Sequence, residues 1–524
     1  MPVLTAVDVL NVQGYVFASN QLNDVISASW VVHWATSKNG ALDEWEKHVI
    51  FAAGGNALLE FETFEDARLF AAIYTRLLLD EAPALGVVIV HRQYSKGEMA
   101  AKLQLLQLDL AQAKLKRKVS AQQLGLSINA SCKLTGLPAC GFDQNNDGPL
   151  SKKILFWRKS KVKEAAQERW SSFLQNKTKK WEFPLDLDQM GRSYGESSIL
   201  GVVHVDGNGI GDRIRDWLNK CVDNKDPDQV VRDGYRKWSE ELEGLMEKVL
   251  QTLVDRILFA VQDDQIKGVL AGREIEIELD KNNGVTYLPM RPVLLGGDDL
   301  TILCDGRIAL DLAACALKVF ETSKLNYLGS VSACAGIALV HTHYPFFRAY
   351  EIAEKLCSSA KSKRREKNEQ GSWLDWHLGE LKPGESISSF REQNYSVEAD
   401  VGKYATCRPY RLNINSSTFM EDWRWLTEEL LGSKDFGFSG NKWSNRRNKI
   451  KQLPSLVRQG PVSVKRALET WQIIDAKLCF PKELGIDGFF SNERSPLIDA
   501  VEILDLYFPL INGSSAVDGM EVTK

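Results

Sequence analysis

One pattern of segments occurs twice in this chain, and this repetition constrains the fold more than any other feature of the sequence. In each copy, a first apolar run carries an aspartate at its end, Asp8 in one copy and Asp206 in the other. Two further apolar runs follow later in each copy, and a Gly-Gly pair joins them, at 54–55 and at 296–297. Glycines between short apolar runs are typical of β-hairpins. The copies are separated by far more than the roughly 50 residues of a solenoid repeat. The sequence therefore predicts a duplicated domain.

The first copy occupies residues 1–118, where strand and helix patterns alternate. The expected segments are strands at 3–10, 48–53, 57–61 and 86–90 and helices at 21–36, 64–80 and 98–118. Thr63 and Asp66 are typical of a capped helix start and support the helix at 64–80. The β-α-β-β-α-β order is that of a ferredoxin-like palm.

The second copy, residues 197–395, repeats this order. Its expected segments are strands at 199–205, 292–295, 300–304 and 331–340 and helices at 230–261, 308–322 and 346–363. Residues 119–196 break the pattern with a turn signal at 145–148 and a basic helical stretch at 159–180, which indicates a connector. Residues 408–515 have helical patterns at 423–431, 442–459, 464–476 and 497–506. We therefore predict an α+β protein with two ferredoxin-like palms, a connecting subdomain and an α-helical C-terminal domain.

Composition excludes several classes of protein. The chain has 524 residues, of which 44% are hydrophobic and 26% charged, as in an ordinary globular protein of several domains. Its apolar runs are shorter than the roughly 20 residues that span a bilayer, and its first residues lack the basic start of a signal peptide. A formal charge of −4 excludes a global polycation for nucleic acid, and nine scattered cysteines favour a reducing compartment. We expect a cytoplasmic protein without a membrane partner.

The most informative motif is the hairpin Gly296-Gly297-Asp298-Asp299 between two apolar runs. Its glycines allow a tight turn and let a nucleotide approach the backbone. Asp206 ends the strand that a palm places beside this hairpin, so three carboxylates are expected within reach of one another. Such oxygen donors suit Mg²⁺ or Mn²⁺, and two ions of this kind activate an attacking hydroxyl and stabilise a pyrophosphate leaving group. The alternative is a polar hairpin turn without a metal.

The basic end of the helix at 346–363 is a second candidate. Lys361 is followed by Lys363, Arg364 and Arg365. A lysine at this place can bind a triphosphate, but basic residues at a helix C-terminus also complement the helix dipole. Spacing alone leaves both interpretations open.

Several motifs together resemble a nucleotidyl cyclase palm. They are VDGNGIG at 205–211, LGGDD at 295–299, SACAGIA at 332–338 and the pair Ala360-Lys361. Diguanylate cyclases share this arrangement with a GGDEF or GGEEF hairpin. A closer resemblance is to the polymerase-like large subunit of type III CRISPR effector complexes (the Csm/Cmr signature subunit), which has two palms and carries GGDD in the second. Residues 8–17, 51–57 and 408–410 resemble its opening strand and helix, its degenerate first hairpin and the join to its helical domain.

This resemblance implies an enzyme that builds cyclic oligoadenylates from ATP for a separate downstream effector protein. It implies that Asp206, Asp298 and Asp299 are catalytic and hold the metals. The nucleotide-binding residues that it implies are Gly207, Asn208, Gly209, Gly296, Gly297 and Lys361 in the second palm and Asp8, Gly54, Gly55 and Asn56 in the first. The amides of 207–209 would follow the phosphates, and Lys361 would contact the triphosphate. Asn56 and Ala57 replace the hairpin carboxylates, so the first palm is expected to bind an acceptor nucleotide without activating it.

The chain also departs from the family. None of its seven histidines is followed by Asp and the first palm begins within ten residues, so we expect no HD nuclease domain. The family's inter-palm zinc site uses paired CxxC motifs, whereas this connector has Cys132 and Cys140. Two ligands do not complete a four-ligand site, so we expect ordinary thiols rather than zinc. These departures, with the short length, indicate a stand-alone or minimal relative.

Two basic segments with tryptophans, 157–170 and 442–451, are candidates for contact with RNA or with subunits of a guide-RNA complex. The alternatives are a solvated helix face for each segment and core positions for the tryptophans. Because unregulated messenger synthesis would be toxic, the connector and residues 408–524 are also candidate gates of the active site.

The leading interpretation is an ATP-using nucleotidyltransferase that makes a cyclic oligonucleotide signal in prokaryotic antiviral defence. One alternative is a diguanylate-cyclase-like dimer that acts on GTP, which the duplicated palm disfavours. The other is a non-enzymatic scaffold for RNA or partner subunits, which has no need of the three carboxylates.

Overall fold

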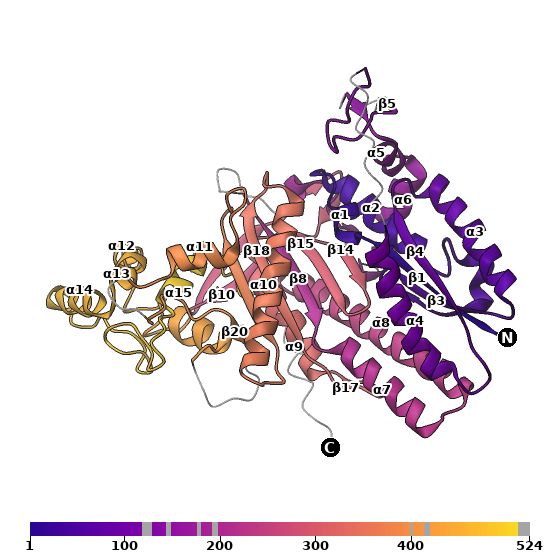
Figure 1. Ribbon diagram of the computed structural model, residues 1–524. Coiled ribbons are helices and arrows are strands. Elements are labelled where there is room, and N and C mark those ends of the chain that lie inside the picture. Colours follow the sequence, from indigo (N-terminus) through magenta and orange to yellow (C-terminus); the bar gives the residue numbers. More distant parts are fainter. Residues whose placement is uncertain are drawn as a thin grey trace.

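The computed structural model describes residues 1–117, 128–142, 148–174, 180–190, 198–398, 402–412 and 420–511. Figure 1 shows two sheets side by side, with the C-terminal helices (yellow) extending away from the second sheet. This arrangement confirms the predicted α+β palm architecture. Within the described ranges, no helix is both long enough and apolar enough to cross a bilayer.

The first sheet has four antiparallel strands in the order β2-β3-β1-β4. Its strands and main helices are β1 (Val3–Leu10), α2 (Leu22–Ala35), β2 (Val49–Ala53), β3 (Asn56–Phe61), α3 (Phe64–Glu81), β4 (Gly86–Gln93) and α4 (Met99–Lys116). Helix α3 begins as predicted, because the Asp66 N–H donates a 3.1 Å hydrogen bond to Oγ1 of Thr63. Each strand and helix expected in this part of the chain is present.

The second sheet has the order β14-β15-β8-β18-β19-β20, and its first four strands repeat the order of the first sheet. Its elements are β8 (Ile199–Gly207), α7 (Ile210–Asn224), α8 (Asp228–Phe259), β14 (Met290–Gly296), β15 (Asp299–Asp305), α9 (Ala309–Thr322), β18 (Ala333–His341), α10 (Phe346–Glu366), β19 (Trp373–Leu378) and β20 (Tyr410–Arg411). Sequence patterns missed α7, β19 and a hairpin of β10 (Gln265–Leu270) and β11 (Arg273–Glu278). Strand β20 lies in the range expected to be helical and completes this sheet.

Strand β8 separates two layers of the hydrophobic core. Val203 and Val205 pack in the layer that includes α8 and α9, whereas Val202 packs in the other layer with α10. Side chains alternate along a strand, so His204 and Asp206 lie on the Val202 side. The polar end of β8 is therefore covered by α10, which also packs on β18.

The two palms make reciprocal contacts near their hairpins. Helix α2 of the first palm packs on β14 of the second, and α8 of the second packs on β2 of the first. Phe17 stacks on Tyr350 of α10 with ring centroids 4.7 Å apart. Arg232 of α8 forms an ion pair with Glu60 of β3, with 2.7 Å between Nε and Oε2. One chain thus supplies both halves of a palm pair.

The connector differs from the single basic helix expected at 159–180. Helix α5 (Lys152–Trp157) ends before Arg158, whose guanidinium forms a buried ion pair with Asp24 of α2, and α6 (Ser160–Glu168) follows. Lys180 begins strand β7 (Lys180–Glu182), which pairs with β13 (Val285–Tyr287). The turn expected at 145–148 lies, except for its last residue, outside the described residues.

The tryptophans of both basic segments are core residues. Trp157, Trp170 and Trp443 are 0%, 7% and 1% exposed. This burial removes them as stacking platforms for RNA bases and leaves only the charged side chains of these segments to contact a partner.

The helix expected at 442–459 is in fact two short helices, α12 (Arg447–Ile450) and α13 (Leu453–Gln459). Asn445 has a left-handed φ of 58°, and this conformation ends any regular helix before α12. The remaining helical patterns correspond to a π-helix at Trp425–Leu431, α14 (Pro461–Ile474) and α15 (Leu497–Ile503).

Candidate active site

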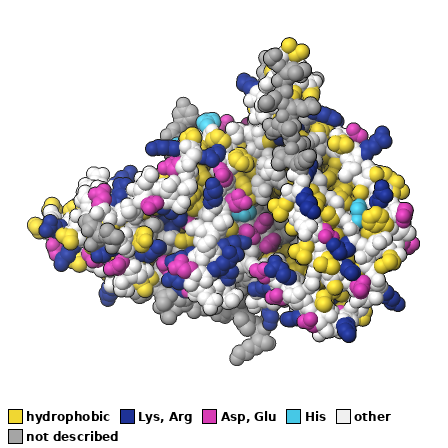
Figure 2. Space-filling model, in the orientation of Figure 1, with side chains coloured by type: hydrophobic (Ala, Val, Ile, Leu, Met, Phe, Trp, Pro, Cys, Tyr) yellow, Lys and Arg dark blue, Asp and Glu magenta, His cyan; other side chains and the backbone are white. Residues whose placement is uncertain are grey.

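The three predicted carboxylates meet at the end of β8. Asp206 and Asp299 are paired residues on the adjacent antiparallel strands β8 and β15, and Asp298 occupies the turn before β15. One carboxylate oxygen from each of Asp206, Asp298 and Asp299 lies within 4.8 Å of the others. Gly297 makes this possible, since its φ of 64° turns the chain sharply. Figure 2 shows acidic side chains gathered near the middle of the visible face, with basic side chains beside them.

The cluster holds more negative charge than its surroundings neutralise. Burial and the neighbouring Asp206 raise the pKa of Asp298 from 3.8 to about 6. Burial, Asp206 and Asp298 raise the pKa of Asp299 well above its usual range. Like charges held together in a partly desolvated site oppose ionisation in this way. The three side chains therefore fit a divalent cation, which would relieve their repulsion through oxygen ligands.

Lys361 of α10 is the cation that contacts this cluster directly. Its Nζ lies 2.5 Å from Oδ2 of Asp206 and donates a 3.1 Å hydrogen bond to the carbonyl oxygen of Gly207. Burial opposes the charged ammonium, but the hydrogen bond and charge of Asp206 outweigh burial and raise the pKa of Lys361. Lys361 therefore points into the carboxylate site, and its contact with a triphosphate stays a prediction.

The predicted phosphate loop is only partly available for a ligand. The Gly207 N–H donates to the Asp298 carbonyl at 3.1 Å, and the Asn208 N–H donates to the Ser332 carbonyl at 2.8 Å. These two amides brace the loop, which corrects the expectation that they follow the phosphates. Gly209, with a φ of 67°, instead begins α7, whose N-terminal end carries the positive pole of the helix dipole.

The first palm has a corresponding ion pair without the hairpin carboxylates. Asp8 of β1 accepts a 2.6 Å hydrogen bond from Nζ of Lys114, which lies on α4. Helices α4 and α10 hold the same position in their palms, each directly after the fourth palm strand. The pair Asp8–Lys114 thus corresponds to Asp206–Lys361. Asn56, across from Asp8 on β3, has an exposed amide side chain where the second palm has an acid.

The two glycine hairpins touch each other. A β-carbon built on Gly296 would lie 2.5 Å from the α-carbon of Gly54, a distance that no side chain could tolerate. Gly55 is buried, with a φ of 83°, and its carbonyl accepts a 2.8 Å hydrogen bond from the Val9 N–H. The predicted nucleotide-binding residues of both palms therefore border one composite region.

Sequence reasoning missed a second layer of polar residues behind Asp206. His204 lies two residues earlier on the same face of β8, and its Nδ1 is 3.1 Å from Oγ1 of Thr301. Tyr350 and Cys357 of α10 lie over this face, with the His204 and Tyr350 ring centroids 5.4 Å apart. The signal was present: the spacing 350, 357, 361 on α10 is that of one helical face, and 204, 206 that of one strand face.

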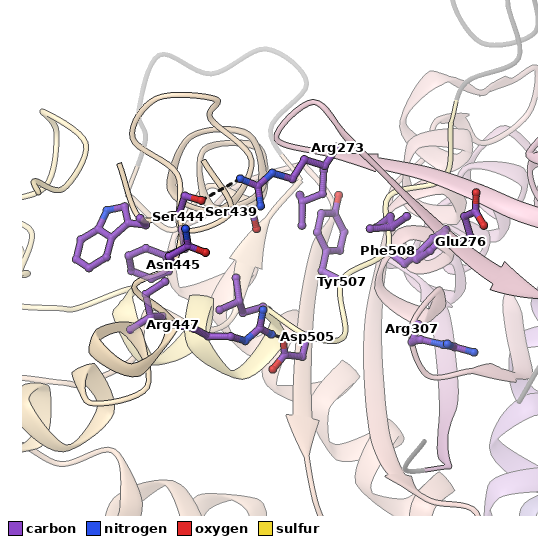
Figure 3. Close-up of a pocket in the computed structure, with 16 residues that line it drawn as sticks. Arg273, Glu276, Arg307, Ser439, Ser444, Asn445, Arg447, Asp505, Tyr507 and Phe508 are labelled. Atoms are coloured by element: carbon purple, nitrogen blue, oxygen red, sulfur yellow. Dashed lines mark hydrogen bonds and ion pairs between the residues drawn. The ribbon is translucent and has the colours of Figure 1, made fainter. Parts of the chain in front are cut away.

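A separate cavity of about 530 Å³ lies between the β10–β11 hairpin and the C-terminal helices (Figure 3). Arg273 reaches across it to donate a 3.2 Å hydrogen bond to Oγ of Ser444, and Arg447 forms an ion pair with Asp505. Tyr507 and Phe508 contribute aromatic lining. The residues that line this cavity include none of the three clustered carboxylates but include part of the basic segment 442–451.

Comparisons with known proteins agree with this geometry. Residues 199–370 match the family model described as Cas10/Cmr2, second palm domain. No curated protein sequence matches the chain. The structure is similar to Csm1 of T. onnurineus, with 14% identity and a TM-score of 0.55 over 96% of this chain and 69% of that one.

Two further similar structures are Csm1–Csm4 cassettes with bound ligands. The cassette in complex with one ATP is 12% identical, with a TM-score of 0.51 over 97% of this chain and 70% of that one. The cassette in complex with pppApApA is 11% identical, with a TM-score of 0.51 over 96% of this chain and 69% of that one. Residues 199–370 are thus similar to the second palm domain of Cas10/Cmr2, and the chain has a fold like that of Csm1.

Proposed function

We propose that the protein is a nucleotidyltransferase that joins ATP molecules into a cyclic oligoadenylate signal. The observation that carries this proposal is the cluster of Asp206, Asp298 and Asp299 with Lys361, set in a Cas10/Cmr2 second palm. The similar Csm1–Csm4 cassettes bind ATP and pppApApA, which are the substrate and a linear intermediate expected for such a reaction.

We assign the three carboxylates to Mg²⁺ or Mn²⁺. Burial and the neighbouring carboxylates raise the pKa values of Asp298 and Asp299, and a bound divalent ion would favour their ionised form. Bound there, the metal would lower the pKa of an attacking 3′-hydroxyl and stabilise the departing pyrophosphate. The protein's own part is to hold the carboxylates at fixed positions on β8 and on the hairpin.

The donor nucleotide would lie between Lys361 and the start of α7. Without a nucleotide, Lys361 is paired with Asp206. When a triphosphate binds, the ammonium would transfer to the phosphates and leave Asp206 to the metal. The N-terminal end of α7 would attract the same phosphates. In the nucleotide-bound site, the carboxylates would therefore bind the metal and the lysine would bind the phosphates.

The acceptor nucleotide would lie on the first palm. There the Asp8–Lys114 pair offers a cation for phosphate, while Asn56 and Ala57 offer no carboxylate for a metal. The contact between Gly54 and Gly296 holds this acceptor region beside the donor hairpin. A reaction between nucleotides on opposite palms then needs no second copy of the chain, which disfavours the symmetric GTP-using alternative.

The proposal is tested by incubating the full chain with each nucleoside triphosphate and Mg²⁺ or Mn²⁺ and identifying products by mass spectrometry. Cyclic adenylates from ATP are expected, and Asp299→Asn should abolish them. Glu247→Gln, at an exposed position on α8, is the matched control and should keep the activity. A cyclic dinucleotide from GTP alone would favour the alternative enzyme. Nucleotide binding without turnover under all conditions, including added partner subunits and RNA, would favour a scaffold.

We also propose that this chain works with partners, as Csm1 does with Csm4 in the compared cassettes. RNA and further subunits are candidates for the exposed charges of residues 442–451 and for the neighbouring cavity. A released cyclic oligoadenylate would act on a separate effector protein in the cytoplasm.

A further inference from the structure

A second set of metal-ligating side chains shares Asp206 with the carboxylate cluster. One ligand atom from each of His204, Asp206 and Cys357 lies within 4.8 Å of the others. His204 and Cys357 are 5% and 2% exposed, whereas the Asp206 side chain is 30% exposed. The set is therefore closed on its His and Cys side and open toward solvent at Asp206.

The neighbours of these side chains hold them in a ligating arrangement. Nδ1 of His204 is hydrogen-bonded to Oγ1 of Thr301, so Nε2 is the ring nitrogen that remains to bind a metal ion. An outer hydrogen bond of this kind orients the histidines of metal sites. The Cys357 thiol donates to the Cys334 carbonyl at 3.2 Å, which fixes the position of Sγ on the buried face of α10.

The donor set differs in chemistry from the three carboxylates. Nitrogen, sulfur and oxygen ligands suit Zn²⁺, while Mg²⁺ prefers oxygen alone. Three protein ligands with a water as the fourth complete a tetrahedral zinc site. Tetrahedral bonds of about 2.0–2.3 Å place ligand atoms about 3.3–3.8 Å from one another. The three ligand atoms lie within 4.8 Å of one another, so they reach this spacing by moving together by at most about 1.5 Å.

We propose that His204, Asp206 and Cys357 form an inhibitory Zn²⁺ site that withdraws Asp206 from the catalytic cluster. This inference rests on the proposed function for its inhibitory effect, but the metal binding does not. As the zinc–sulfur bond forms, the Cys357 thiol releases its proton to solvent. Zn²⁺ bound to Asp206 competes with the ion pair to Lys361 and turns the carboxylate away from Asp298 and Asp299.

The binding is tested with Co²⁺ as a spectroscopic probe on the full chain, without nucleotide. A cobalt–thiolate charge-transfer absorption is expected, together with its displacement by Zn²⁺. Cys357→Ser, which keeps a donor for the Cys334 carbonyl, should lose the absorption, and Cys357→Ala should lose it too. Cys304→Ser is the matched control and should keep it, because the buried Cys304 thiol also donates to a backbone carbonyl but lies in the other layer of the core. An absence of the band, or its persistence in both Cys357 variants, overturns the site.

The inhibition is tested separately, with each variant compared with its own zinc-free rate at fixed Mg²⁺ and ATP. Cys357→Ser and His204→Gln should each need at least about tenfold more Zn²⁺ for half-inhibition, because each lacks one ligand. Unchanged zinc sensitivity in both variants would place the inhibitory ion on the carboxylates and refute the proposal. If the chain makes no product at all, the cobalt titration still decides whether the site exists, so the two failures are distinguishable.

Discussion

Gly54 of the first palm and Gly296 of the second are in backbone contact, so a β-carbon on Gly296 would lie 2.5 Å from the Gly54 α-carbon. This contact joins the two hairpins that carry the candidate donor and acceptor regions. It also explains why both hairpins keep glycine at this position although only the second has the carboxylate pair. The spacing of the two hairpins is thus set by two residues without side chains.

Gly296→Ala is expected to separate the hairpins and lower turnover by on the order of 10²-fold, since a shift of about 1 Å in a reacting pair costs that much. Steady-state product formation and thermal unfolding measure the effect. Gly244→Ala on α8, where an added β-carbon meets nothing within 4 Å, is the control and should retain activity. Normal turnover of a folded Gly296→Ala protein would show that the contact does not set the reaction geometry.

A bulky side chain in the first hairpin should block the acceptor nucleotide, and the structure decides where to put it. Gly55→Trp is unsuitable, because Gly55 is buried and has a left-handed φ of 83° that residues with side chains rarely adopt. Tryptophan there would unfold the hairpin. Exposed Asn56 is the better position, and Asn56→Trp is expected to impair product formation while donor binding survives. Loss of ATP binding in this variant would invert the assignment of the palms.

Asp206→Asn and Asp299→Ala are each expected to abolish product in a folded protein. Asp299→Ala removes a carboxyl group from a crowded cluster, so its free energy of unfolding without metal should hold or rise. Asp206→Asn also leaves Lys361 without its ion-pair partner, so this variant is judged by product formation alone. Product analysis and chemical denaturation with a chelator present test the two parts. Substantial turnover in a folded Asp299→Ala protein would remove the two-metal proposal.

The contribution of Asp298 to the stability of the metal-free protein is expected to fall as the pH rises from about 4 through 6, whereas His33, His204 and His377, whose pKa values burial lowers, act in the opposite direction. The folded state holds a proton on Asp298 up to a pKa of about 6, whereas the unfolded chain releases it near 3.8. The folded state therefore binds more protons at Asp298 in this window, and raising the pH favours unfolding through this group. Denaturation midpoints against pH isolate this contribution as the difference between the wild type and Asp298→Asn, which should shrink as the pH rises through 6. Added Mg²⁺ should stabilise the protein above pH 6 and have little effect at pH 4.

Lys361→Met and Lys114→Met should act on different nucleotides. The first removes the cation at the donor triphosphate and should weaken binding of a non-hydrolysable ATP analogue to the second palm. The second leaves Asp8 without its ion-pair partner in the first palm and should lower product formation with donor binding unchanged. Ligand titration combined with turnover separates the two effects, and identical profiles would contradict distinct sites.

Charge reversal in the tail must preserve the ion pairs found there. Arg446 pairs with Asp475 at 3.2 Å and Arg447 pairs with Asp505, so simple reversal would bring like charges together in both pairs as well as change any RNA contact. The exchange Arg446→Asp with Asp475→Arg keeps a pair. If RNA binds here, the response to RNA should be lost in the exchanged protein and kept in the Asp475→Asn control. RNA binding by the wild type should weaken steeply as the salt concentration rises. A normal response in the exchanged protein would exclude Arg446 as an RNA contact.

Local patterns were sufficient for the palms and for the cluster of carboxylates. The features used were apolar runs of strand length, the glycine turn and the alternation of faces along β8, all of which depend on residues close together in the sequence. They were enough to predict Asp206 and Asp299 on neighbouring strands, and the structure confirms this prediction. The prediction of one helix at 442–459 was wrong because it also used only the local pattern. Its apolar spacing is helical, but the left-handed Asn445 interrupts it.

The sequence alone determined two palms and three clustered carboxylates, because hydrophobic period and turn chemistry are encoded within short segments. Tertiary structure alone decided that Gly54 touches Gly296, that Lys114 pairs with Asp8 and that Cys357 lies beside His204. These contacts join segments up to about 240 residues apart, and they follow from which faces of the palms and helices bury each other. A residue's neighbours along the chain carry no information about which faces pack against each other.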